Sequence, residues 1–353
     1  MSTINKKFRI AVLGSGSWGT TIGKVVAENT AEKSDLFEPI VKMWAREETL
    51  CDNINEEHEN NKYLSHIKLP ENLVAVSNIL ETVAGADLII FNFPHQFLAT
   101  ICADLAGHIP AGTRAVSCLK GLNVDENGCQ LLTDFIYEKL GVSCGALSGA
   151  NLAPEVAIEN WSGTTIAYKL PDDFRGHGQD IDADVLHKLF ARSYFEVSVV
   201  DDVAGVSLAG ALKNIVALPV GFVDGMKWGN NARAAIMVKG QLEIIKFGRT
   251  FFPECAVKTF SNESAGLADL IATCSGGRNA RIGKMMAETK KSAKECERDY
   301  LNGQSAQGIH TTDEVYRFLE AKNAIDDFPL FAATYNIIYQ GEDMKKIPEL
   351  LKQ

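Results

Sequence analysis

The sequence lacks the signatures of several special classes of protein. Its eight cysteines form no CxxC pair and its seven histidines show no HExxH or other paired spacing, so we expect no metal site. Scattered cysteines are typical of reduced thiols in a cytoplasmic protein rather than of a secreted disulfide framework. We find no targeting segment ahead of the first apolar stretch, which begins at Phe8, and no apolar run of transmembrane length. These absences predict a cytoplasmic protein without a membrane partner.

Basic residues are fewer than acidic residues. The chain carries 35 Lys and Arg against 45 Asp and Glu, a formal net charge of -10. Nucleic acid is therefore not expected as a partner, because phosphate backbones require clustered positive charge. A small phosphorylated ligand is compatible with this balance, since a few local lysines and arginines can hold it. The 353 residues exceed one ordinary core, which favours two domains.

What the chain does contain near its start is a glycine-rich turn. Residues 8–19 read FRIAVLGSGSWG, an apolar run followed by Gly14, Gly16 and Gly19 in GxGxxG spacing. In a dinucleotide-binding unit the first glycine permits the turn, the second leaves room for a pyrophosphate, and the third lets the helix pack close to the strand. The helix start then offers N–H groups and partial positive charge to the phosphates. Three glycines also fit an ordinary turn, but the strand-like run before them and the helix-compatible TTIGKVVAEN after them favour a dinucleotide site.

Up to about residue 200, short apolar runs alternate with amphipathic segments, which is typical of a parallel sheet with helices on both faces. After the first strand we predict strands at 40–44, 73–76, 87–93, 114–117, 145–149, 164–167 and 195–200. Helices are expected between them at 47–59, 97–106, 130–140 and 183–191. The predicted fold class is α/β, with a Rossmann-type doubly wound sheet forming a dinucleotide-binding domain of residues 1–200.

The pattern of residues 201–353 predicts helices only. These residues are expected to form an all-α substrate-binding domain. We expect the helices at 203–223, 232–251, 267–274, 278–288, 312–322 and 330–340. Thr312, which two acidic residues follow, is the expected cap of one helix. Several apolar helix faces in this half favour a homodimer.

Two lysines interrupt otherwise uncharged segments. Lys120 lies in SCLKG, just past a predicted strand on the cofactor side of the sheet, where it could also be idle in solvent. Lys213 and Asn214 interrupt the apolar helix GALKNIVAL. A buried ammonium without a partner costs several kcal/mol, so Lys213 needs a counter-charge or a catalytic role unless it reaches the helix surface.

Two further segments have the composition of ligand sites. In GLADLIATCSGGRNARIG, Asp269 and Thr273 are four residues apart and share a helix face. The glycine pair before Arg278 and Asn279 suits a phosphate site built from backbone N–H groups and a guanidinium. An ordinary turn between two helices explains the glycines equally well. NGQSAQG, at 302–308, is a polar loop that could close over a ligand or simply solvate a turn.

Together these blocks resemble the NAD-dependent glycerol-3-phosphate dehydrogenases. The likeness rests on GSGSWG at 14–19, FPHQF at 93–97, SCLKG at 117–121, SGANLAPE at 148–155, LKN at 212–214, GLADL and GGRN within 266–279, and NGQSAQG at 302–308. These blocks follow the family's order and spacing over nearly the whole chain. NKYLSHIKLPENL, at 61–73, is similar to the longer eukaryotic, cytosolic branch.

The resemblance implies that dihydroxyacetone phosphate, NADH and a proton are reversibly converted into sn-glycerol 3-phosphate and NAD. It implies a catalytic group with Lys213 as the acid/base and with Lys120 and Asp269 beside it. The pocket for this phosphorylated triose would comprise Lys120, Asn214, Thr273, Arg278, Asn279 and Gln307. The residues implied to bind NAD are Gly14, Ser15, Gly16, Ser17, Trp18, Gly19, Phe97, Lys120, Ala153, Arg278 and Gln307.

Physical chemistry agrees with these roles. As hydride arrives at the C2 carbonyl, negative charge grows on its oxygen, and a nearby ammonium can stabilise and then protonate the alkoxide. A free lysine has a pKa of about 10.4, so we expect desolvation and Lys120 to lower the pKa of Lys213 while Asp269 raises it. Arg278 and Asn279 would hold the phosphate, a remote handle that fixes C2 against the nicotinamide ring.

One departure from the family pattern concerns the cofactor. A Rossmann unit usually carries an acidic residue at the end of its second strand, where it binds the ribose hydroxyls. Here Trp44 is followed by Ala45 and Arg46, and similar eukaryotic sequences usually have an aromatic residue in place of Arg46. An arginine there could stack on adenine or attract a 2′-phosphate. We favour NAD over NADP.

Two other functions fit parts of the pattern. A 6-phosphogluconate-type or other 3-hydroxyacid dehydrogenase would also join a Rossmann domain to a helical domain with a Lys-Asn pair, but GGRN and SCLKG argue against it. A nucleotide sensor that has lost catalysis would lack catalytic groups, whereas Lys120, Lys213 and Asp269 are all present.

Overall fold

The computed structural model describes residues 6–125, 128–301 and 305–352. Contacts between residues divide the chain into two compact units. The first unit runs to Val203, and the second begins at Ala204, near the division predicted at residue 200. Two earlier segments, Lys120–Leu131 and Ser148–Ala150, nevertheless belong to the second unit.

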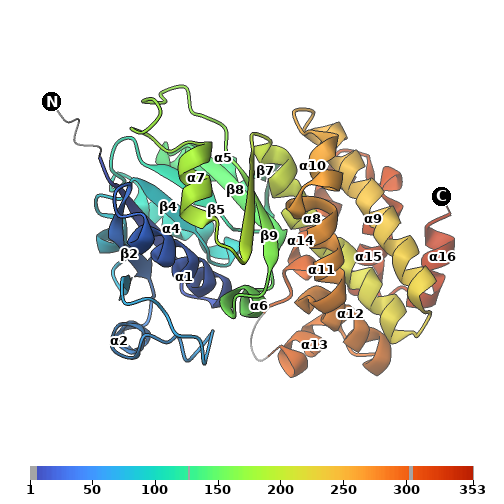
Figure 1. Cartoon of the computed structure of the whole chain (residues 1–353). Coiled ribbons are helices and arrows are strands. Elements are labelled where there is room, and N and C mark those ends of the chain that lie inside the picture. Colours follow the sequence, from blue (N-terminus) through green and yellow to red (C-terminus); the bar gives the residue numbers. More distant parts are fainter. Residues whose placement is uncertain (1–5, 126–127, 302–304, 353) are drawn as a thin grey trace. The chain divides into compact units, whose positions relative to one another are not determined.

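The first unit is built on an eight-stranded sheet in the order β10-β9-β8-β5-β4-β1-β2-β3 (Figure 1). Its strands are β1 (Phe8–Leu13), β2 (Phe37–Trp44), β3 (Leu73–Val76), β4 (Leu88–Phe91), β5 (Arg114–Ser117), β8 (Cys144–Ala150), β9 (Ser162–Ala167) and β10 (Phe195–Val200). The pairs β1–β2, β1–β4, β2–β3, β4–β5, β5–β8 and β9–β10 are all parallel. The predicted Rossmann-type doubly wound sheet is therefore confirmed.

Helices cover both faces of this sheet. Successive strand residues point to opposite sides, and both sides carry apolar residues that the helices bury. In β1, Ile10 and Val12 join one buried apolar cluster, while Ala11 and Leu13 join another. The first cluster includes residues of α1 (Ser17–Glu32), α2 (Glu48–Glu57), α6 (Ala153–Ala157) and α7 (Ala183–Phe190). The second includes residues of α3 (Ile79–Val83), α4 (Leu98–Leu105) and α5 (Leu132–Leu140). A short 3₁₀ turn, His95–Phe97, follows β4.

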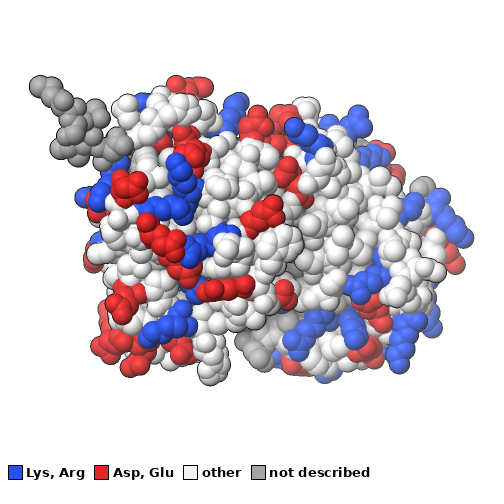
Figure 2. Space-filling model, in the orientation of Figure 1, with Lys and Arg blue, Asp and Glu red and all other residues white. Residues whose placement is uncertain are grey.

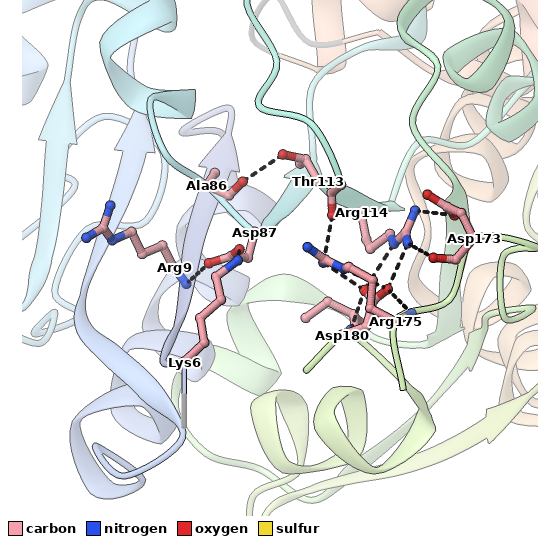
Figure 3. A network of polar contacts seen from close by, with 11 residues as sticks. Lys6, Arg9, Ala86, Asp87, Thr113, Arg114, Asp173, Arg175 and Asp180 are labelled. Carbon is pink, nitrogen blue, oxygen red and sulfur yellow. Dashed lines mark hydrogen bonds and ion pairs between the residues drawn. The ribbon is translucent and has the colours of Figure 1, made fainter. Parts of the chain in front are cut away.

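A buried ion cluster lies at the amino end of β5 (Figure 3). Asp180 accepts two hydrogen bonds from Arg114, at 3.1 and 2.7 Å, and two from the side chain of Arg175, at 3.2 and 3.1 Å. Arg114 also pairs with Asp173 at 3.0 Å. Despite burial, these bonds hold the pKa of Asp180 well below its ordinary value, and they raise the pKa of Arg114. The cluster fixes the segment between β9 and α7 to the sheet, at the edge opposite the glycine turn.

Among the described residues from Val203 onward only helices and helical turns occur, which confirms the predicted helical C-terminal domain, but a hairpin from earlier in the chain joins them in the second unit. The strands β6 (Leu122–Asp125) and β7 (Gly128–Leu131) form an antiparallel hairpin that belongs to this unit. The helix expected from residue 130 starts only at Leu132. Gly128 has a φ of +145°, a conformation that side-chain-bearing residues rarely adopt. The glycine after DEN was a hairpin signal in the sequence that the helix prediction overlooked.

Helices make up the rest of the second unit. They are α8 (Val203–Gly225), α9 (Asn230–Phe251), α10 (Val257–Asn262), a π-helical turn (Ser264–Ala268), α11 (Asp269–Gly276), α12 (Arg278–Thr289), α13 (Ala293–Tyr300), α14 (Gln307–Ala321), α15 (Pro329–Tyr339) and α16 (Ile347–Leu350). Short 3₁₀ turns lie at Ile325–Asp327 and Met344–Lys346. The prediction missed α10 and α13, although Ser292 and Glu295 form a capping box at the start of α13.

The central helix α8 corrects a second expectation, that no apolar stretch has transmembrane length. By length and composition α8 could cross a membrane, the only such helix among the described residues. However, 94% of its most apolar stretch is buried inside the protein. Its neighbours in the apolar cluster of this unit include Phe247, Phe260 and Phe331. Helix α8 is therefore the core helix of the second unit.

Helix α14 begins five residues earlier than predicted. Thr312 is not its cap: Thr312 lies inside the helix, and its hydroxyl donates a hydrogen bond to the carbonyl oxygen of Gly308 at 2.6 Å. The helix starts at Gln307, because Gly308 packs against α8 so closely that a Cβ would lie 2.3 Å from the carbonyl oxygen of Asn214.

Candidate active site

Each glycine of the turn after β1 has the geometry that dinucleotide binding requires. Gly14 has a φ of +115°, and a Cβ there would lie 2.0 Å from the carbonyl oxygen of Asn92. A Cβ on Gly19 would lie 2.1 Å from the carbonyl oxygen of Gly14, so α1 packs directly against the turn. A Cβ on Gly16, in contrast, would meet nothing within 4 Å. Gly16 thus borders the open space in which a pyrophosphate could lie at the start of α1.

Other residues fix the turn from within the first unit. The carbonyl oxygen of Ser15 accepts hydrogen bonds from Thr20, at 3.1 Å, and from Asn60, at 2.8 Å. The Ser17 hydroxyl donates to the carbonyl oxygen of Tyr63 at 2.7 Å, which joins the turn to the 61–73 segment. Trp18 packs edge-on against Phe195, so its ring belongs to the core, and only its backbone is suited to a ligand at the turn.

The remaining cofactor residues of the first unit follow neighbouring strands. Ala153 begins α6, and its carbonyl oxygen accepts a hydrogen bond from Thr21 of α1 at 3.2 Å. Phe97 follows β4, at the same sheet edge as Gly14, and is 47% exposed. Sequence reasoning missed Asn92, whose buried side-chain nitrogen has no hydrogen-bond partner in the described chain. A buried donor beside Gly14 without a partner fits a cofactor acceptor at this edge.

At the end of β2 the structure provides no carboxylate for the ribose. The carbonyl oxygen of Trp44 accepts a hydrogen bond from the backbone of Gly14 at 3.2 Å, so this strand end adjoins the turn. Ala45 is buried and Arg46 is exposed. Glu47 is paired with Lys62 at 2.6 Å. Arg46 is therefore a positively charged side chain at this strand end that is open to a ligand.

In the second unit, three predicted site residues meet around the carboxylate of a fourth, Asp269. One oxygen, Oδ1, pairs with the ammonium of Lys213 and accepts a hydrogen bond from Thr273 at 3.4 Å. The other, Oδ2, pairs with Lys120 at 3.4 Å. Lys213 and Asp269 are 4% and 2% exposed, whereas Lys120 is half-buried. The expected counter-charge for Lys213 is thus Asp269, and Lys213 does not reach the surface of its helix.

This environment makes the ammonium of Lys213 easy to deprotonate. Burial lowers the pKa of Lys213 from 10.5 to about 7, because desolvation outweighs the attraction of Asp269, and the nearby charge of Lys120 lowers the pKa further. A group that titrates near neutrality can both donate and accept a proton during turnover.

A chain of buried amides aligns the helices around this cluster. Asn214 donates a hydrogen bond to the carbonyl oxygen of Gly210 at 3.3 Å. Its own side-chain oxygen accepts one from Asn279 at 2.8 Å. Asn279 in turn accepts a hydrogen bond from the backbone of Gly308 at 2.9 Å. The two asparagines therefore join α8, α12 and the start of α14, and most of their bonding capacity is used within the protein.

The amide chain also brings Arg278 and Gln307 together, since they are the sequence neighbours of its members Asn279 and Gly308. Arg278 begins α12 and reaches solvent, and the surrounding protein lowers the pKa of its guanidinium by desolvation. Gln307 begins α14, and its buried Nε2 has no hydrogen-bond partner in the part of the chain that the structure describes. Two helix starts, a guanidinium and a buried donor without a partner suit an anionic ligand. Residues 302–304 of the predicted polar loop lie outside the described residues.

Sequence reasoning missed one contact of the cluster. Ser148, at the end of β8, donates a hydrogen bond to Oδ2 of Asp269 at 3.1 Å. Ser148 belongs to the SGANLAPE block, which was the available signal, but the chain folds it against a residue 121 positions away. No group of three or more His, Cys, Asp or Glu suited to a metal occurs among the residues described.

The chemistry of these parts defines a class. The first unit has the glycine turn of a dinucleotide-binding fold. The second unit has a buried lysine whose pKa burial lowers to about 7, and an arginine that reaches solvent at the start of α12. These features together are those of a Rossmann-fold dehydrogenase that acts on the carbonyl group of an anionic substrate.

Comparisons with known proteins specify the family. The family description "NAD-dependent glycerol-3-phosphate dehydrogenase N-terminus" matches residues 9–173, and the corresponding C-terminus matches residues 202–349. The glycerol-3-phosphate dehydrogenase [NAD(+)] of Pichia angusta is 58% identical over 352 residues, which cover 98% of this chain and 92% of that protein. This chain belongs to the NAD-dependent glycerol-3-phosphate dehydrogenases, and its cofactor is NAD.

Two relatives from Saccharomyces cerevisiae extend the comparison. The protein named glycerol-3-phosphate dehydrogenase [NAD(+)] 2, mitochondrial, is 55% identical, with 98% of this chain and 80% of that protein covered. A solved glycerol-3-phosphate dehydrogenase superposes with a TM-score of 0.93 at 54% identity, covering 99% of this chain and 100% of that one. A 2-dehydropantoate 2-reductase from Porphyromonas gingivalis, at 14% identity and a TM-score of 0.56, shares the fold alone.

Proposed function

We propose that Lys213 is the general acid/base in the reversible reduction of dihydroxyacetone phosphate to sn-glycerol 3-phosphate. The observation that carries this proposal is the burial of Lys213 beside Asp269 and Lys120, which lowers its pKa to about 7. Bound NADH supplies the hydride. Lys213 then gives its proton to the oxygen on C2, and in the reverse direction it accepts the proton of the C2 hydroxyl.

Asp269 and Lys120 tune this exchange in opposite senses. Asp269 stabilises the ammonium of Lys213 and so keeps it protonated long enough to act as an acid. Lys120 destabilises that ammonium and adds a second positive charge near the developing alkoxide. After the proton has left Lys213, the carboxylate of Asp269 still neutralises Lys120, because the two are paired at 3.4 Å.

The phosphate of the substrate is held, in this proposal, by Arg278 at the start of α12. Gln307 contributes its Nε2 to the substrate or to the cofactor, and Asn279 and Asn214 act mainly by aligning α12 and α14. Thr273 lies next to Asp269 and completes the pocket. A phosphate held away from the reacting carbon provides binding energy that orients C2 for reaction.

In the first unit, the turn from Gly14 to Gly19 would hold the pyrophosphate, with Ser15, Ser17 and Trp18 contributing backbone groups. Phe97 and Ala153 border the same sheet edge. Lys120, Arg278 and Gln307, which the family resemblance also assigns to NAD, belong to the second unit. The open space at Gly16 supports this assignment.

Replacing Lys213 tests the proposal. We expect Lys213→Ala to lower turnover by about a thousandfold, since a positioned general acid contributes on the order of 10² to 10⁴. Binding of NADH, followed by its fluorescence, should persist. Lys239→Ala, in the neighbouring helix α9, is the matched control and should retain turnover. Near-normal turnover of Lys213→Ala would refute Lys213 as the acid.

We propose further that the protein forms a homodimer through an apolar surface on the second unit. Val238 and Leu242, one turn apart on α9, are 59% and 58% exposed, and Val257, Leu267 and Ile271 on adjoining elements are 41–47% exposed. Figure 2 shows few charged side chains over α11. Exposed apolar surfaces of this kind commonly bind another protein surface.

Light scattering measures the mass of the particle and thus tests the homodimer. The native protein should have twice the mass of one chain, and Leu242→Glu should halve it without loss of helical content. Leu170→Glu, at an exposed leucine of the first unit, should leave the dimer intact. A native protein with the mass of one chain would contradict the proposal.

We propose a cytoplasmic location for this protein. The expectation rests on the scattered cysteines and on the likeness to the cytosolic branch of the family, whereas one yeast relative is named mitochondrial. Fluorescence of the chain carrying a C-terminal tag, compared with a mitochondrial dye in the source cells, tests the location.

A further inference from the structure

Ser148 is the contact of Asp269 that the predicted site does not include. It is 4% exposed and lies at the end of β8, in the three-residue segment that contacts assign to the second unit. Its hydroxyl and the ammonium of Lys120 approach the same carboxylate oxygen, Oδ2, at 3.1 and 3.4 Å. The other oxygen is left to Lys213 and Thr273.

Gly210 shows that α8 packs directly on Ser148. A Cβ at Gly210 would lie 2.7 Å from the hydroxyl oxygen of Ser148. Gly210 stands one turn before Lys213 and Asn214, and its carbonyl oxygen accepts a hydrogen bond from Asn214. Ser148 thus lies between the helix that carries the lysine and the carboxylate that neutralises it.

The four contacts of the carboxylate differ in rigidity. Lys120 and Lys213 are long side chains with several rotatable bonds, whereas the hydroxyl of Ser148 is attached to a strand through a single carbon. A short donor on a rigid element therefore limits rotation of the carboxylate better than either ammonium does. The rotation of the carboxylate of Asp269 determines whether Oδ1 is directed at the ammonium of Lys213.

We propose that Ser148 is a positioning residue of this dehydrogenase, which orients Asp269 so that one carboxylate oxygen is held against Lys213. The inference rests on the proposed role of Lys213 as acid/base. Ser148 does not touch the substrate or exchange a proton with it. Its effect passes through Asp269 to the protonation of Lys213.

Loss of the Ser148 hydroxyl has a predictable direction. A carboxylate that rotates more freely stabilises the ammonium of Lys213 less, so the pKa of Lys213 falls. The other ionisable groups that act on this position are Lys120 and Cys274, and a substitution at Ser148 alters neither. Reduction of the ketone requires the protonated lysine, so its activity should decline at a lower pH than in the native enzyme.

The experiment measures kcat for reduction of dihydroxyacetone phosphate as a function of pH. Ser148→Ala should lower kcat on the order of tenfold, the effect of removing a hydrogen bond to a charged group. The alkaline decline should move down by about half a pH unit to one unit. Ser148→Thr keeps a hydroxyl and should restore both values. Ser207→Ala is the matched control, because this α8 hydroxyl has no hydrogen-bond partner in the described chain, and it should match the native enzyme.

The outcomes separate this inference from the proposed function. If Lys213→Ala stays active in the same assay, the proposed function fails and the inference falls with it. If Lys213→Ala is inactive but Ser148→Ala keeps the native pH profile, only the inference is overturned. Equal losses in Ser148→Ala and Ser148→Thr would also overturn it, since the hydroxyl would not be responsible. Should Ser148→Ala fail to fold, Ser148→Cys, a weaker donor of similar size, must show an intermediate shift, and a native profile would refute the role.

Discussion

Both units bury a carboxylate between two cations, and the two clusters behave in opposite ways. In the first unit Asp180 lies between Arg114 and Arg175, and in the second Asp269 lies between Lys213 and Lys120. Beside Asp180 the pKa of the buried cation rises, whereas beside Asp269 the pKa of the buried cation falls. The same balance of charge thus produces a permanent ion cluster in one case and a titratable cluster in the other.

The difference follows from the chemistry of the cations. A guanidinium has five donors in a plane, so Arg114 engages both oxygens of Asp180 and keeps its charge when buried. An ammonium is a compact charge that water hydrates strongly. A contact with one carboxylate compensates poorly for the loss of that hydration. The arginine cluster therefore stays charged when buried, whereas burial lowers the pKa of Lys213. The first arrangement suits structural support, and the second suits proton transfer.

Breaking the arginine cluster should have the largest effect on stability. Asp180→Asn leaves two guanidinium groups against a neutral amide, and we expect the free energy of unfolding to fall by about 3–5 kcal/mol. Because the pKa of Asp180 is lowered on folding, its contribution is present above the ordinary pKa of an aspartate and is lost as the pH falls. Urea denaturation at neutral pH measures the loss. Asp173→Asn, at a 71% exposed partner of Arg114, should cost less than 1 kcal/mol, roughly the value of a surface pair.

The equivalent substitution in the lysine cluster should affect catalysis more than folding. Asp269→Asn should lower kcat by about a hundredfold, as expected when a proton-transfer group is mistuned. Its effect on the free energy of unfolding should be smaller than that of Asp180→Asn, because Lys213 can lose its proton whereas Arg114 cannot. Steady-state kinetics and urea denaturation on the same samples test both statements. A greater loss of stability in Asp269→Asn would contradict the comparison.

A third buried carboxylate, Glu243, sharpens the comparison, since it makes no ion pair within the described chain. It accepts hydrogen bonds from the backbone of Leu330 and Phe331 at 2.7 and 3.0 Å, and burial raises its pKa from 4.5 to about 7. A raised pKa means that the folded state holds the proton more tightly, so stability falls as the pH rises from about 4.5 to about 7. We expect a decrease of about 3 kcal/mol. Glu243→Gln should flatten this pH dependence in thermal or urea unfolding, and an unchanged slope would refute the assignment.

Arg278 should matter to binding rather than to stability, unlike Arg114. Arg278→Ala should lower kcat/KM for dihydroxyacetone phosphate on the order of tenfold to a hundredfold, because it removes a charged contact to the phosphate. The free energy of unfolding should change little, since this side chain reaches solvent. Arg281→Ala, one turn further along α12 and exposed, is the matched control. Unchanged KM and kcat/KM in Arg278→Ala would refute the phosphate role.

The smallest effect is expected at Arg46. The enzyme should prefer NADH over NADPH, and Arg46→Ala should reduce the residual kcat/KM with NADPH about fivefold more than that with NADH, the value of one exposed charge contact. Comparing the two cofactors at equal ionic strength tests this. Equal effects on both would show that Arg46 does not interact with a 2′-phosphate.

Local sequence was a good guide wherever local physics decides the structure. The strands at 73–76, 114–117 and 195–200 were placed to the residue, because short runs rich in valine have a strong strand propensity. Prediction failed at the β6–β7 hairpin, where a local glycine signal was overlooked, and at Thr312, which lies inside α14. The contact of Lys213 with Asp269 matches the sequence expectation, whereas the contact of Ser148 with Asp269 was not expected, since nothing local in its segment points to Asp269.

By itself, the sequence determined the alternation of strands and helices and the glycine turn. It also determined that one lysine, Lys213, stands in an apolar helix, where a charge needs a partner. These depend on residues that are close along the chain. The family resemblance implied Asp269 beside that lysine, but only the tertiary structure makes the contacts, because Lys120, Ser148, Lys213 and Asp269 come from four separate segments. The tertiary structure also decided the protonation of Lys213, since desolvation depends on everything packed around a charge and not on its neighbours in the chain.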